Sequence, residues 1–368
     1  MTDEPLNLTP LDALHRELGG KMVPFAGYSM PVQYPAGILT EHLHCRAKAG
    51  LFDVSHMGQA SLRGPGAAAA LEALVPGDMI GLQPGRQKYT LLMTAEGTIL
   101  DDLMVANLGE DHLFLVVNAS RKHIDLPHLA AHLPKSVMLE SHTDRALLAL
   151  QGPEAVAVLS RFAPEVAAMP FMGFITTRLL GATCHISRSG YTGEDGYEIS
   201  IPAEHATEIA RALLAEPEVM PIGLGARDSL RLEAGLCLYG NDIDETTNPV
   251  EAALMWVMSK RRKTDWDFLG ANKVRAMLEA GPPRKRVGIQ PEGRAPARGH
   301  TEIRAPDGSH AGEITSGGFG PSCNAPVAMG YVRADLAAVG TALSLMVRGK
   351  PLPARVVALP FFPHRYVR

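Results

Sequence analysis

Leu62-Arg63-Gly64-Pro65-Gly66-Ala67 has a close parallel further along the chain in Leu150-Gln151-Gly152-Pro153-Glu154-Ala155. Each copy follows a short strand-like run and leads into an apolar-periodic helix that a proline ends. The Gly-Pro pair suits this junction, because proline is well tolerated in the first turn of a helix. A strand–turn–helix unit that occurs twice predicts two related α/β halves.

The rest of each half is predicted to consist of strands and a closing helix. These are strands at 88–94, 100–107 and 112–118 with a helix at 124–132, and strands at 183–188 and 196–201 with a helix at 205–214. Each half has a hairpin with acidic residues, Asp101 and Asp102 in the first and Glu194, Asp195 and Glu198 in the second. If the halves pack about a pseudo-two-fold axis, we expect these carboxylates to approach a shared crevice.

The C-terminal part has a different composition, and a Gly/Pro/basic linker at 280–286 precedes it. Glycines and prolines then separate short strand-like runs at 287–290, 301–304, 310–315, 327–332, 342–347 and 354–358. This spacing predicts a small all-β barrel. We therefore expect an α/β (α+β) chain with two related halves in residues 1–280 and a barrel in residues 281–368.

The composition is that of a globular protein: the 368 residues are 46% hydrophobic and 20% charged, with a net charge of −4. This mild negative charge argues against a nucleic-acid-binding protein. No apolar run reaches membrane-spanning length, and the acidic N-terminus resembles neither a signal nor a transit peptide, so we expect a cytoplasmic location. Four scattered cysteines predict neither a disulfide nor a zinc site, and His42-Leu43-His44-Cys45 alone is weak evidence for a metal.

The most informative segment is the glycine-rich stretch 187–199. Its three glycines permit positive φ and close approach of a ligand, but their spacing matches neither a dinucleotide fingerprint nor a P-loop. Strand alternation places Tyr197 and Ile199 on one face and Glu198 on the other. The alternative interpretation is a β-hairpin with solvated acids.

Charged residues are also paired in a predicted helix that begins after Gly225. Arg227 and Arg231 are four residues apart and so share a face of this helix. We interpret Arg231 as part of an ion-pair ladder that involves Asp228 and Glu233. Arg227 lies near the helix start beside a glycine loop, where it is better placed to bind a ligand anion.

Asp101 and Asp102 are adjacent acids in a predicted strand. Adjacent strand residues project to opposite faces, so at most one of the two is expected to face a buried site. A partly buried carboxylate is the usual device for positioning or relaying a proton. The alternative is a turn-flanking pair in water.

At these segments the sequence closely resembles the aminomethyltransferase T-protein family of the glycine cleavage system. The matches run in order from about residue 10 to the C-terminus. They are Gly50-Leu51-Phe52-Asp53-Val54-Ser55-His56-Met57-Gly58, Ile99-Leu100-Asp101-Asp102-Leu103, Val116-Val117-Asn118, Gly190-Tyr191-Thr192-Gly193-Glu194-Asp195-Gly196-Tyr197-Glu198, Gly225-Ala226-Arg227-Asp228, Leu238-Tyr239-Gly240-Asn241-Asp242-Ile243-Asp244-Glu245, Gly312-Glu313-Ile314-Thr315-Ser316-Gly317 and Pro360-Phe361-Phe362. One departure is Gly320, where the family usually has serine before Pro321, and it affects no assigned role.

The resemblance implies a reaction and a shape. The lipoyl arm of the H-protein brings an aminomethyl group, and the enzyme releases ammonia and passes the one-carbon unit to tetrahydrofolate. The product is 5,10-methylenetetrahydrofolate, and no metal is implied. The resemblance also implies a ring-like, three-part fold whose central opening holds the folate.

The resemblance further implies roles for particular residues. Asp102 matches the catalytic acid, and Glu198 matches the carboxylate that accepts from the pterin amino group and ring N–H. Arg227 and Tyr366 match binding residues. Four further positions match residues that line the folate pocket of the family. They are Met57, Tyr89, Asn118 and Tyr191. Core packing is an alternative role for Met57, whereas Tyr89 and Tyr191 suit stacking on a ligand ring.

Two other functions fit parts of this pattern. A folate-dependent demethylase module would carry a flavin domain with a dinucleotide motif, and this chain has neither that motif nor room for the domain. A non-catalytic folate-binding protein of the same fold would carry a Lys-Gly-Cys-Tyr-type motif, which is absent from this sequence. The basic run Lys260-Arg261-Arg262-Lys263 is interpreted as a solvated surface, with an acidic partner or a polyglutamate tail as the alternative.

Overall fold

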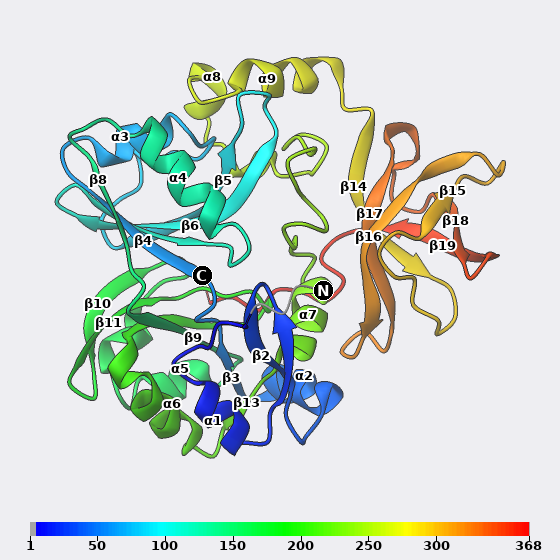
Figure 1. Cartoon of the computed structure of the whole chain (residues 1–368). Coiled ribbons are helices and arrows are strands. Elements are labelled where there is room, and N and C mark those ends of the chain that lie inside the picture. Colours follow the sequence, from blue (N-terminus) through cyan, green and yellow to red (C-terminus); the bar gives the residue numbers. More distant parts are fainter. Residues whose placement is uncertain (1–4, 368) are drawn as a thin grey trace.

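The computed structural model describes residues 5–367 and has three lobes arranged around a common centre (Figure 1). Two mixed α/β lobes adjoin each other, and a barrel forms the third lobe. This confirms the predicted fold class and the ring-like, three-part arrangement. Among residues 5–367, no helix has the length and apolar character needed to cross a membrane.

The first half forms a five-stranded sheet in the order β5-β6-β7-β4-β8. Helices α3 and α4 lie on the outer side of this sheet (Figure 1). The elements are β4 (Gly58–Arg63), α3 (Ala67–Glu72), β5 (Arg86–Met93), β6 (Ile99–Gly109), β7 (His112–Val117), α4 (Lys122–His132) and β8 (Met138–Ser141).

The second half forms a six-stranded sheet in the order β10-β11-β12-β9-β3-β13. Its first four strands repeat the order β5-β6-β7-β4 of the other sheet, which confirms the two related halves predicted from the repeated motif. The elements are β9 (Arg145–Gln151), α5 (Ala155–Leu159), η1 (Pro164–Ala168), β10 (Phe174–Leu179), β11 (Ala182–Ser187), β12 (Gly196–Pro202), η2 (Ala203–His205), α6 (Ala206–Leu214) and β13 (Val219–Pro221).

The N-terminal segment does not form a unit of its own. It supplies β3 (Ala49–Asp53), which lies between β9 and β13 in the second sheet. β3 is antiparallel to β9 and parallel to β13. The segment also contains α1 (Asp12–Glu17), α2 (Ile38–Ala47) and the small β-hairpin of β1 (Lys21–Phe25) and β2 (Tyr28–Gln33).

The repeated Gly-Pro motif has the same structural reason in both halves. Gly64 and Gly152 have φ values of +126° and +129°, which side chains rarely adopt. A Cβ at Gly64 would lie 2.1 Å from the carbonyl oxygen of Ser136, and one at Gly152 would lie 2.1 Å from that of Lys48. Both positions therefore require glycine for the turn from the strand into α3 or α5.

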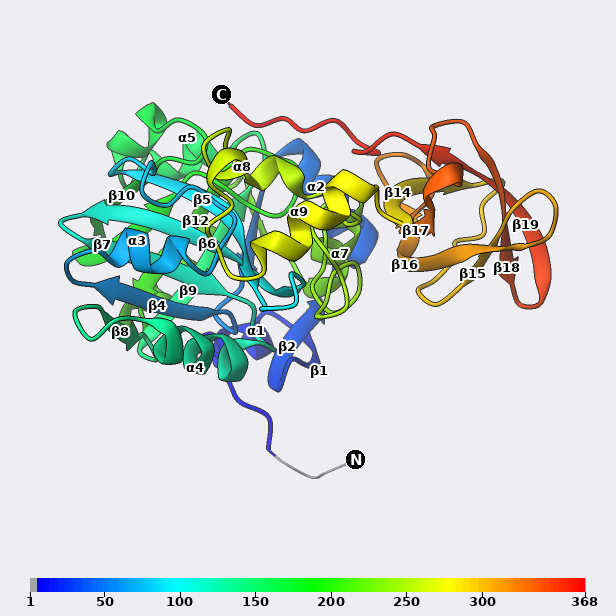
Figure 2. The ribbon, with the colours of Figure 1, turned by 90° about the horizontal axis from the view of Figure 1, so that it is seen from above.

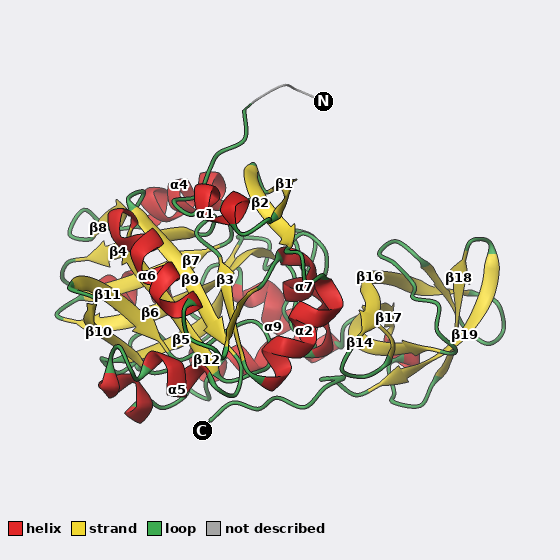
Figure 3. Ribbon diagram, turned by 90° about the horizontal axis from the view of Figure 1, so that it is seen from below, coloured by secondary structure: helices red, strands yellow, loops and turns green. Residues whose placement is uncertain are grey.

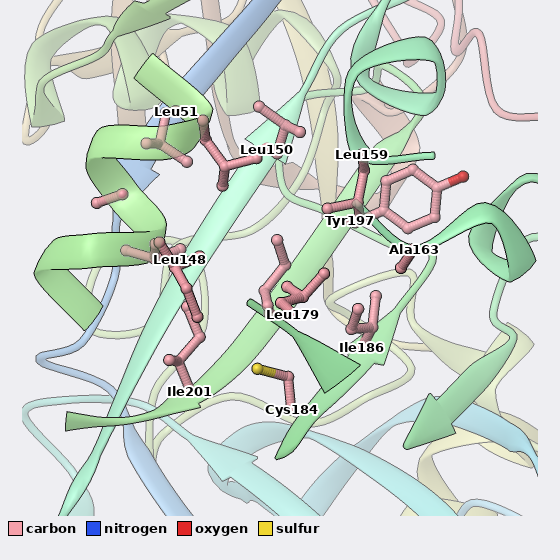
Figure 4. Packing of buried hydrophobic residues seen from close by; sticks show 14 of the residues in the cluster. Leu51, Leu148, Leu150, Leu159, Ala163, Leu179, Cys184, Ile186, Tyr197 and Ile201 are labelled. Atoms are coloured by element: carbon pink, nitrogen blue, oxygen red, sulfur yellow. The ribbon is translucent and has the colours of Figure 1, made fainter. Parts of the chain in front are cut away.

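The core of the second half lies between its sheet and the helices α5 and α6. Figure 4 shows Leu148, Leu150 and Tyr197 among the buried side chains of this cluster. Tyr197 and Ile199 belong to the cluster, so Glu198 points to the opposite face of β12. The alternation predicted for this strand is confirmed.

The third lobe is a closed six-stranded barrel with the order β14-β17-β16-β15-β18-β19. Each of the six predicted runs corresponds to one of its strands. They are β14 (Arg284–Pro291), β15 (Glu302–Arg304), β16 (His310–Gly320), β17 (Ala325–Arg333), β18 (Ala342–Val347) and β19 (Lys350–Val357), with η4 (Ala334–Leu336) between β17 and β18.

Two connections join the barrel to the sheets. Helix α7 (Leu224–Glu233) contacts β16 and β17, and Figure 3 shows α2, α7 and α9 (Ala271–Ala280) between the sheets and the barrel. After β19 the chain leaves the barrel and runs back over the two halves (Figure 2). On this return the backbone N–H of Arg365 donates to the carbonyl of Gly193 at 2.8 Å. The tail thus contacts the glycine-rich segment directly.

The basic run 260–263 differs from the solvated surface that we expected. Arg262, which begins α8 (Arg262–Asp265) after η3 (Met255–Val257), is fully buried. Its guanidinium donates to the carbonyl oxygens of Glu72 and Val75 at 2.8 and 3.0 Å. The side chain therefore joins this loop to the turn after α3, whereas Lys263 is exposed.

Replacing Arg262 is expected to destabilise the fold. Arg262→Met leaves two buried carbonyl oxygens without their donors, and we expect the free energy of unfolding to fall by about 2 kcal/mol. Urea unfolding measures this change, with Lys263→Met as the exposed control. Equal stability of the two variants would contradict a structural role for Arg262.

Candidate active site

A cavity between the two sheets receives side chains from both halves. Glu198 on β12 and Met104 on β6 both line it, and Asp102 lies two residues before Met104 on the same face of β6. The full lining is Gln87, Met104, Ala106, Phe114, Val116, Leu147, Phe174, His185, Ser187, Glu198 and Ser200. The two hairpins thus approach one crevice, as the repeat predicted.

Two of the acids expected at this crevice point elsewhere. Glu194 accepts from Arg46 at 2.8 Å and also pairs with Arg365 of the tail. Asp195 pairs with Arg188 at 2.7 Å. Both carboxylates are buried in ion pairs that hold the glycine-rich segment in place, and Glu198 alone of the three lines the cavity.

Asp101 and Asp102 hydrogen-bond to one amide, although they lie on opposite faces of β6 and only Asp102 shares the face of Met104. The side-chain amide of Asn118 donates to Asp101 Oδ1 at 2.9 Å and to Asp102 Oδ1 at 2.7 Å. The backbone N–H of Asn118 donates to Asp101 Oδ2 at 3.1 Å. Because Asn118 follows the end of β7, its N–H groups are not used in the sheet and reach both acids. Tyr89 also hydrogen-bonds to Asp102.

The environment of Asp102 favours the protonated form more than water does. Burial, and next the negative charge of Asp101, raise the pKa of Asp102 to about 7, against the opposing hydrogen bonds from Tyr89 and Asn118. The carboxyl is surrounded by protein yet remains partly accessible. A carboxyl with a pKa near neutrality can both accept and donate a proton at physiological pH.

The raised pKa has a consequence for stability. A carboxyl whose pKa is higher in the folded than in the unfolded state binds more protons when folded, so its contribution to stability is lost as the pH rises between the two values. For Asp102 this window runs from about 4 to about 7. We expect the unfolding free energy of Asp102→Asn, relative to wild type, to increase across this window and then level off. Urea midpoints at pH 5 and pH 8 test this, and a constant difference would refute it.

Arg227 and Tyr191 form a second group. The guanidinium of Arg227 lies over the ring of Tyr191, 4.8 Å from its centroid. Arg227 Nη1 is buried and has no hydrogen-bond partner within residues 5–367. An unpaired buried donor costs free energy, so this nitrogen is a strong indication of a ligand acceptor. The hydroxyl of Tyr191 donates to the carbonyl of Cys237.

Glu198 lies close enough to Arg227 for their charges to interact. Burial raises the pKa of Glu198, while Arg227 and a hydrogen bond from Ser189 oppose this rise. Burial in turn lowers the pKa of the Arg227 guanidinium, and Glu198 opposes it. The site therefore offers a half-buried carboxylate and a guanidinium donor on one side of the crevice.

The other arginine of α7 has a structural role, as interpreted from the sequence. Arg231 is buried and pairs with Asp228 at 2.7 Å and with Asp242 at 2.8 Å. Glu233 does not belong to this ladder, because it pairs instead with Arg46 at 2.9 Å and with His42. Since His42 also hydrogen-bonds to Ser322 of the barrel, these groups join α2 and α7 to the third lobe.

The remaining predicted residues each pack against other side chains. Met57 is half-buried against a cluster that includes Phe52 and Leu147, so its packing role is visible. Tyr89 stacks on Trp256 with ring centroids 5.4 Å apart. Tyr366 belongs to the returning tail and stacks on Phe171 at 4.3 Å.

Some residues of the site were not anticipated from the sequence. Met104 could have been found, because it follows Asp102 at the two-residue spacing of one strand face. Phe174 and Trp256 carried no such signal. β10 is an edge strand with a partly polar pattern, and Trp256 lies in the short 3₁₀ helix η3. The sequence predicted Asp125 only as part of a helix, but in the structure its carboxyl interacts with that of Asp101.

A crevice between two duplicated sheets, with a carboxyl of near-neutral pKa and an unpaired buried guanidinium, defines an enzyme site for a small polar ligand. The family comparison makes this more specific. The family model described as the GCVT N-terminal domain matches residues 11–262, and the glycine cleavage T-protein C-terminal barrel domain matches residues 284–363. The chain belongs to the glycine cleavage T-protein family.

Individual relatives match this chain over more than nine-tenths of their length. The mitochondrial aminomethyltransferase of Gallus gallus is 48% identical, with 99% of this chain and 94% of that protein aligned. The mitochondrial aminomethyltransferase of Mesembryanthemum crystallinum is 44% identical over 100% and 92% of the two chains. The crystal structure of the glycine cleavage system aminomethyltransferase T from Bartonella henselae superposes with a TM-score of 0.95 at 42% identity, covering 99% of this chain and all of that one.

Proposed function

We propose that this chain is the tetrahydrofolate-dependent aminomethyltransferase of a glycine cleavage system. It takes the aminomethyl group from the lipoyl arm of the H-protein, releases ammonia and forms 5,10-methylenetetrahydrofolate. The observation that carries the proposal is the unpaired buried donor of Arg227, which lies near Glu198 on the cavity wall and over the ring of Tyr191. The charge of Asp102 also acts on Tyr191, so the Asp102–Asn118 group is close to the same residues.

The donors and acceptors of the site fit tetrahydrofolate. The pterin ring presents an amino group and a ring N–H side by side, and the Glu198 carboxylate can accept from both. Arg227 Nη1 is left to donate to an acceptor of the ligand. In this proposal the further folate-binding residues are Tyr191, Tyr89, Asn118, Met57 and Tyr366. The Arg227 guanidinium over the ring of Tyr191 supports the assignment of Tyr191.

Asp102 is then the catalytic residue. Its carboxyl orients the folate and takes up or releases a proton as the aminomethyl carbon is attacked. A pKa near 7 suits both directions of this transfer. Asn118 and Tyr89 hold the carboxyl in position through their hydrogen bonds.

Several further assignments belong to this proposal. The two domains are residues 1–280 and 281–368, the protein partner is the lipoylated H-protein, and the protein works in the cytoplasm without a metal. The relatives from Gallus gallus and Mesembryanthemum crystallinum are mitochondrial. Fractionation of the cells that make this protein, with a mitochondrial or membrane marker where these exist, tests the location.

The test of the function is turnover with aminomethyl-loaded H-protein and tetrahydrofolate. We expect ammonia and 5,10-methylenetetrahydrofolate in equal amounts, with no product from H-protein that lacks its lipoyl group. Calorimetry with tetrahydrofolate distinguishes this function from the alternative. A non-catalytic folate-binding protein would bind the folate and give no turnover.

A further inference from the structure

Asp125 is a buried acid that the reaction does not contact. It lies in the first turn of α4, is completely buried, and neither of its oxygens receives a hydrogen bond from an N–H or O–H donor in the described part of the chain. The polar group that acts on it is the carboxyl of Asp101, which is placed to share a hydrogen bond with it. Two carboxyl groups can make such a bond only if one of them carries the proton.

The donors around the pair decide which acid is protonated. Asp101 accepts two hydrogen bonds from Asn118, one from the backbone N–H at 3.1 Å and one from the amide at 2.9 Å. Burial raises the pKa of Asp101, and both bonds oppose that rise by stabilising the ionised form. Asp125 has no such donors, and burial, followed by the charge of Asp101, raises the pKa of Asp125 to about 10. Asp125 is therefore the carboxylic acid, and its O–H donates to Asp101.

The charges that face Asp125 come from two segments. Asp101 and Asp102 on β6 favour its protonated form, and Arg121, just before α4, opposes them. Arg121 is itself paired with Glu245 at 2.6 Å, so much of its charge is balanced by another group. The net effect of these neighbours agrees with a protonated Asp125.

The same hydrogen bonds continue to the reacting carboxyl. Asn118 Nδ2 donates to Asp101 and to Asp102 at once, so Asp125, Asp101, Asn118 and Asp102 form one chain of contacts. We propose, building on the transferase reaction above, that Asp125 is a positioning residue whose buried acid proton keeps Asp101 ionised and thereby fixes Asn118 and Asp102. Asp125 itself does not touch the folate or the aminomethyl carbon.

Two substitutions separate the donor function of Asp125 from its shape. Asp125→Asn keeps an N–H that can donate to Asp101, and we expect its kcat to stay within about 3-fold of wild type. Asp125→Leu keeps the branched shape and removes the donor. We expect its kcat to fall by about 10-fold or more while KM for tetrahydrofolate changes little, because Glu198 and Arg227 are untouched.

The pH profile distinguishes this role from simple packing. Without its donor, Asp101 takes up a proton itself, and less negative charge then faces Asp102. The midpoint assigned to Asp102 in the kcat profile should therefore move to lower pH in Asp125→Leu and stay in place in Asp125→Asn. Unchanged profiles in both variants, with only lower stability, would overturn the proposal. Asp335→Asn, an exposed aspartate next to Arg333 on the barrel, serves as the control.

A measurement on the wild-type protein does not depend on turnover or on the folding of the leucine variant. With aspartate labelled at Cγ with ¹³C, carboxyl resonances can be followed from pH 5 to pH 9, and Asp125→Asn and Asp101→Asn assign the two signals. The proposal requires a protonated Asp125 beside an ionised Asp101 through neutral pH. An ionised Asp125 beside a protonated Asp101 would overturn the proposal. A wild-type protein that shows the expected protonation states but no turnover would contradict only the proposed function.

Discussion

Asp102→Asn is expected to lower kcat by about 10²–10⁴-fold, the usual effect of removing a positioned acid–base group. The amide oxygen can still accept from Asn118, so the site keeps its shape while it loses the titratable proton. Tetrahydrofolate affinity should change much less, because Glu198 and Arg227 remain. Single-turnover formation of 5,10-methylenetetrahydrofolate measures the chemical step directly.

The control for this experiment is Asp111→Asn, an exposed position in the turn between β6 and β7. Asparagine tolerates the left-handed conformation that Asp111 adopts, so the fold should be unaffected. If Asp102→Asn keeps the wild-type rate, the Asp102 carboxyl takes no part in the chemical step. Only a role in folate binding would then remain for it.

Glu198→Gln is expected to weaken tetrahydrofolate binding by about 10–100-fold, since a hydrogen bond to a charged group contributes about 1.5–3 kcal/mol. The carboxylate accepts from two adjacent donors, whereas glutamine has one acceptor and places an NH₂ group against the other donor. Arg227 also loses its nearby counter-charge. The dissociation constant from calorimetry tests this, and kcat at saturating folate should change less than KM.

Glu204→Gln is the matched control, because Glu204 is exposed in η2 shortly after the same strand. Equal folate affinity in the Glu198 and Glu204 variants would place the pterin elsewhere in the molecule. The cavity between the sheets would then need another occupant.

The fold could be predicted from the sequence because the patterns that define its elements are local. The repeated Gly-Pro turns are enforced by backbone contacts at Gly64 and Gly152, and the barrel strands are bounded by glycines and prolines. The alternation around Glu198 was correct because β12 is regular there. Local rules of this kind predict an element wherever the element itself is regular.

The site was only partly accessible, since its remaining features depend on contacts between distant segments. Asp101 and Asp102 share Asn118 because β7 ends opposite them, which no property of 99–104 reveals. The ion pair of Glu194 with Arg46 depends on α2, which is far away in sequence. Buried charges such as Arg262 look like surface residues until their partners are placed.

Because of the position of β3, the chain cannot be cut into two fragments that each contain one complete half. β3 precedes the whole first half in sequence, yet it pairs with β9 and β13 of the second sheet. A fragment that begins at β9 would lack this strand and would expose an unpaired edge inside a hydrophobic sheet, which is a template for aggregation. The duplicated halves are therefore not interchangeable modules. Fragment complementation should succeed only when the piece that contains β3 is supplied together with the second half.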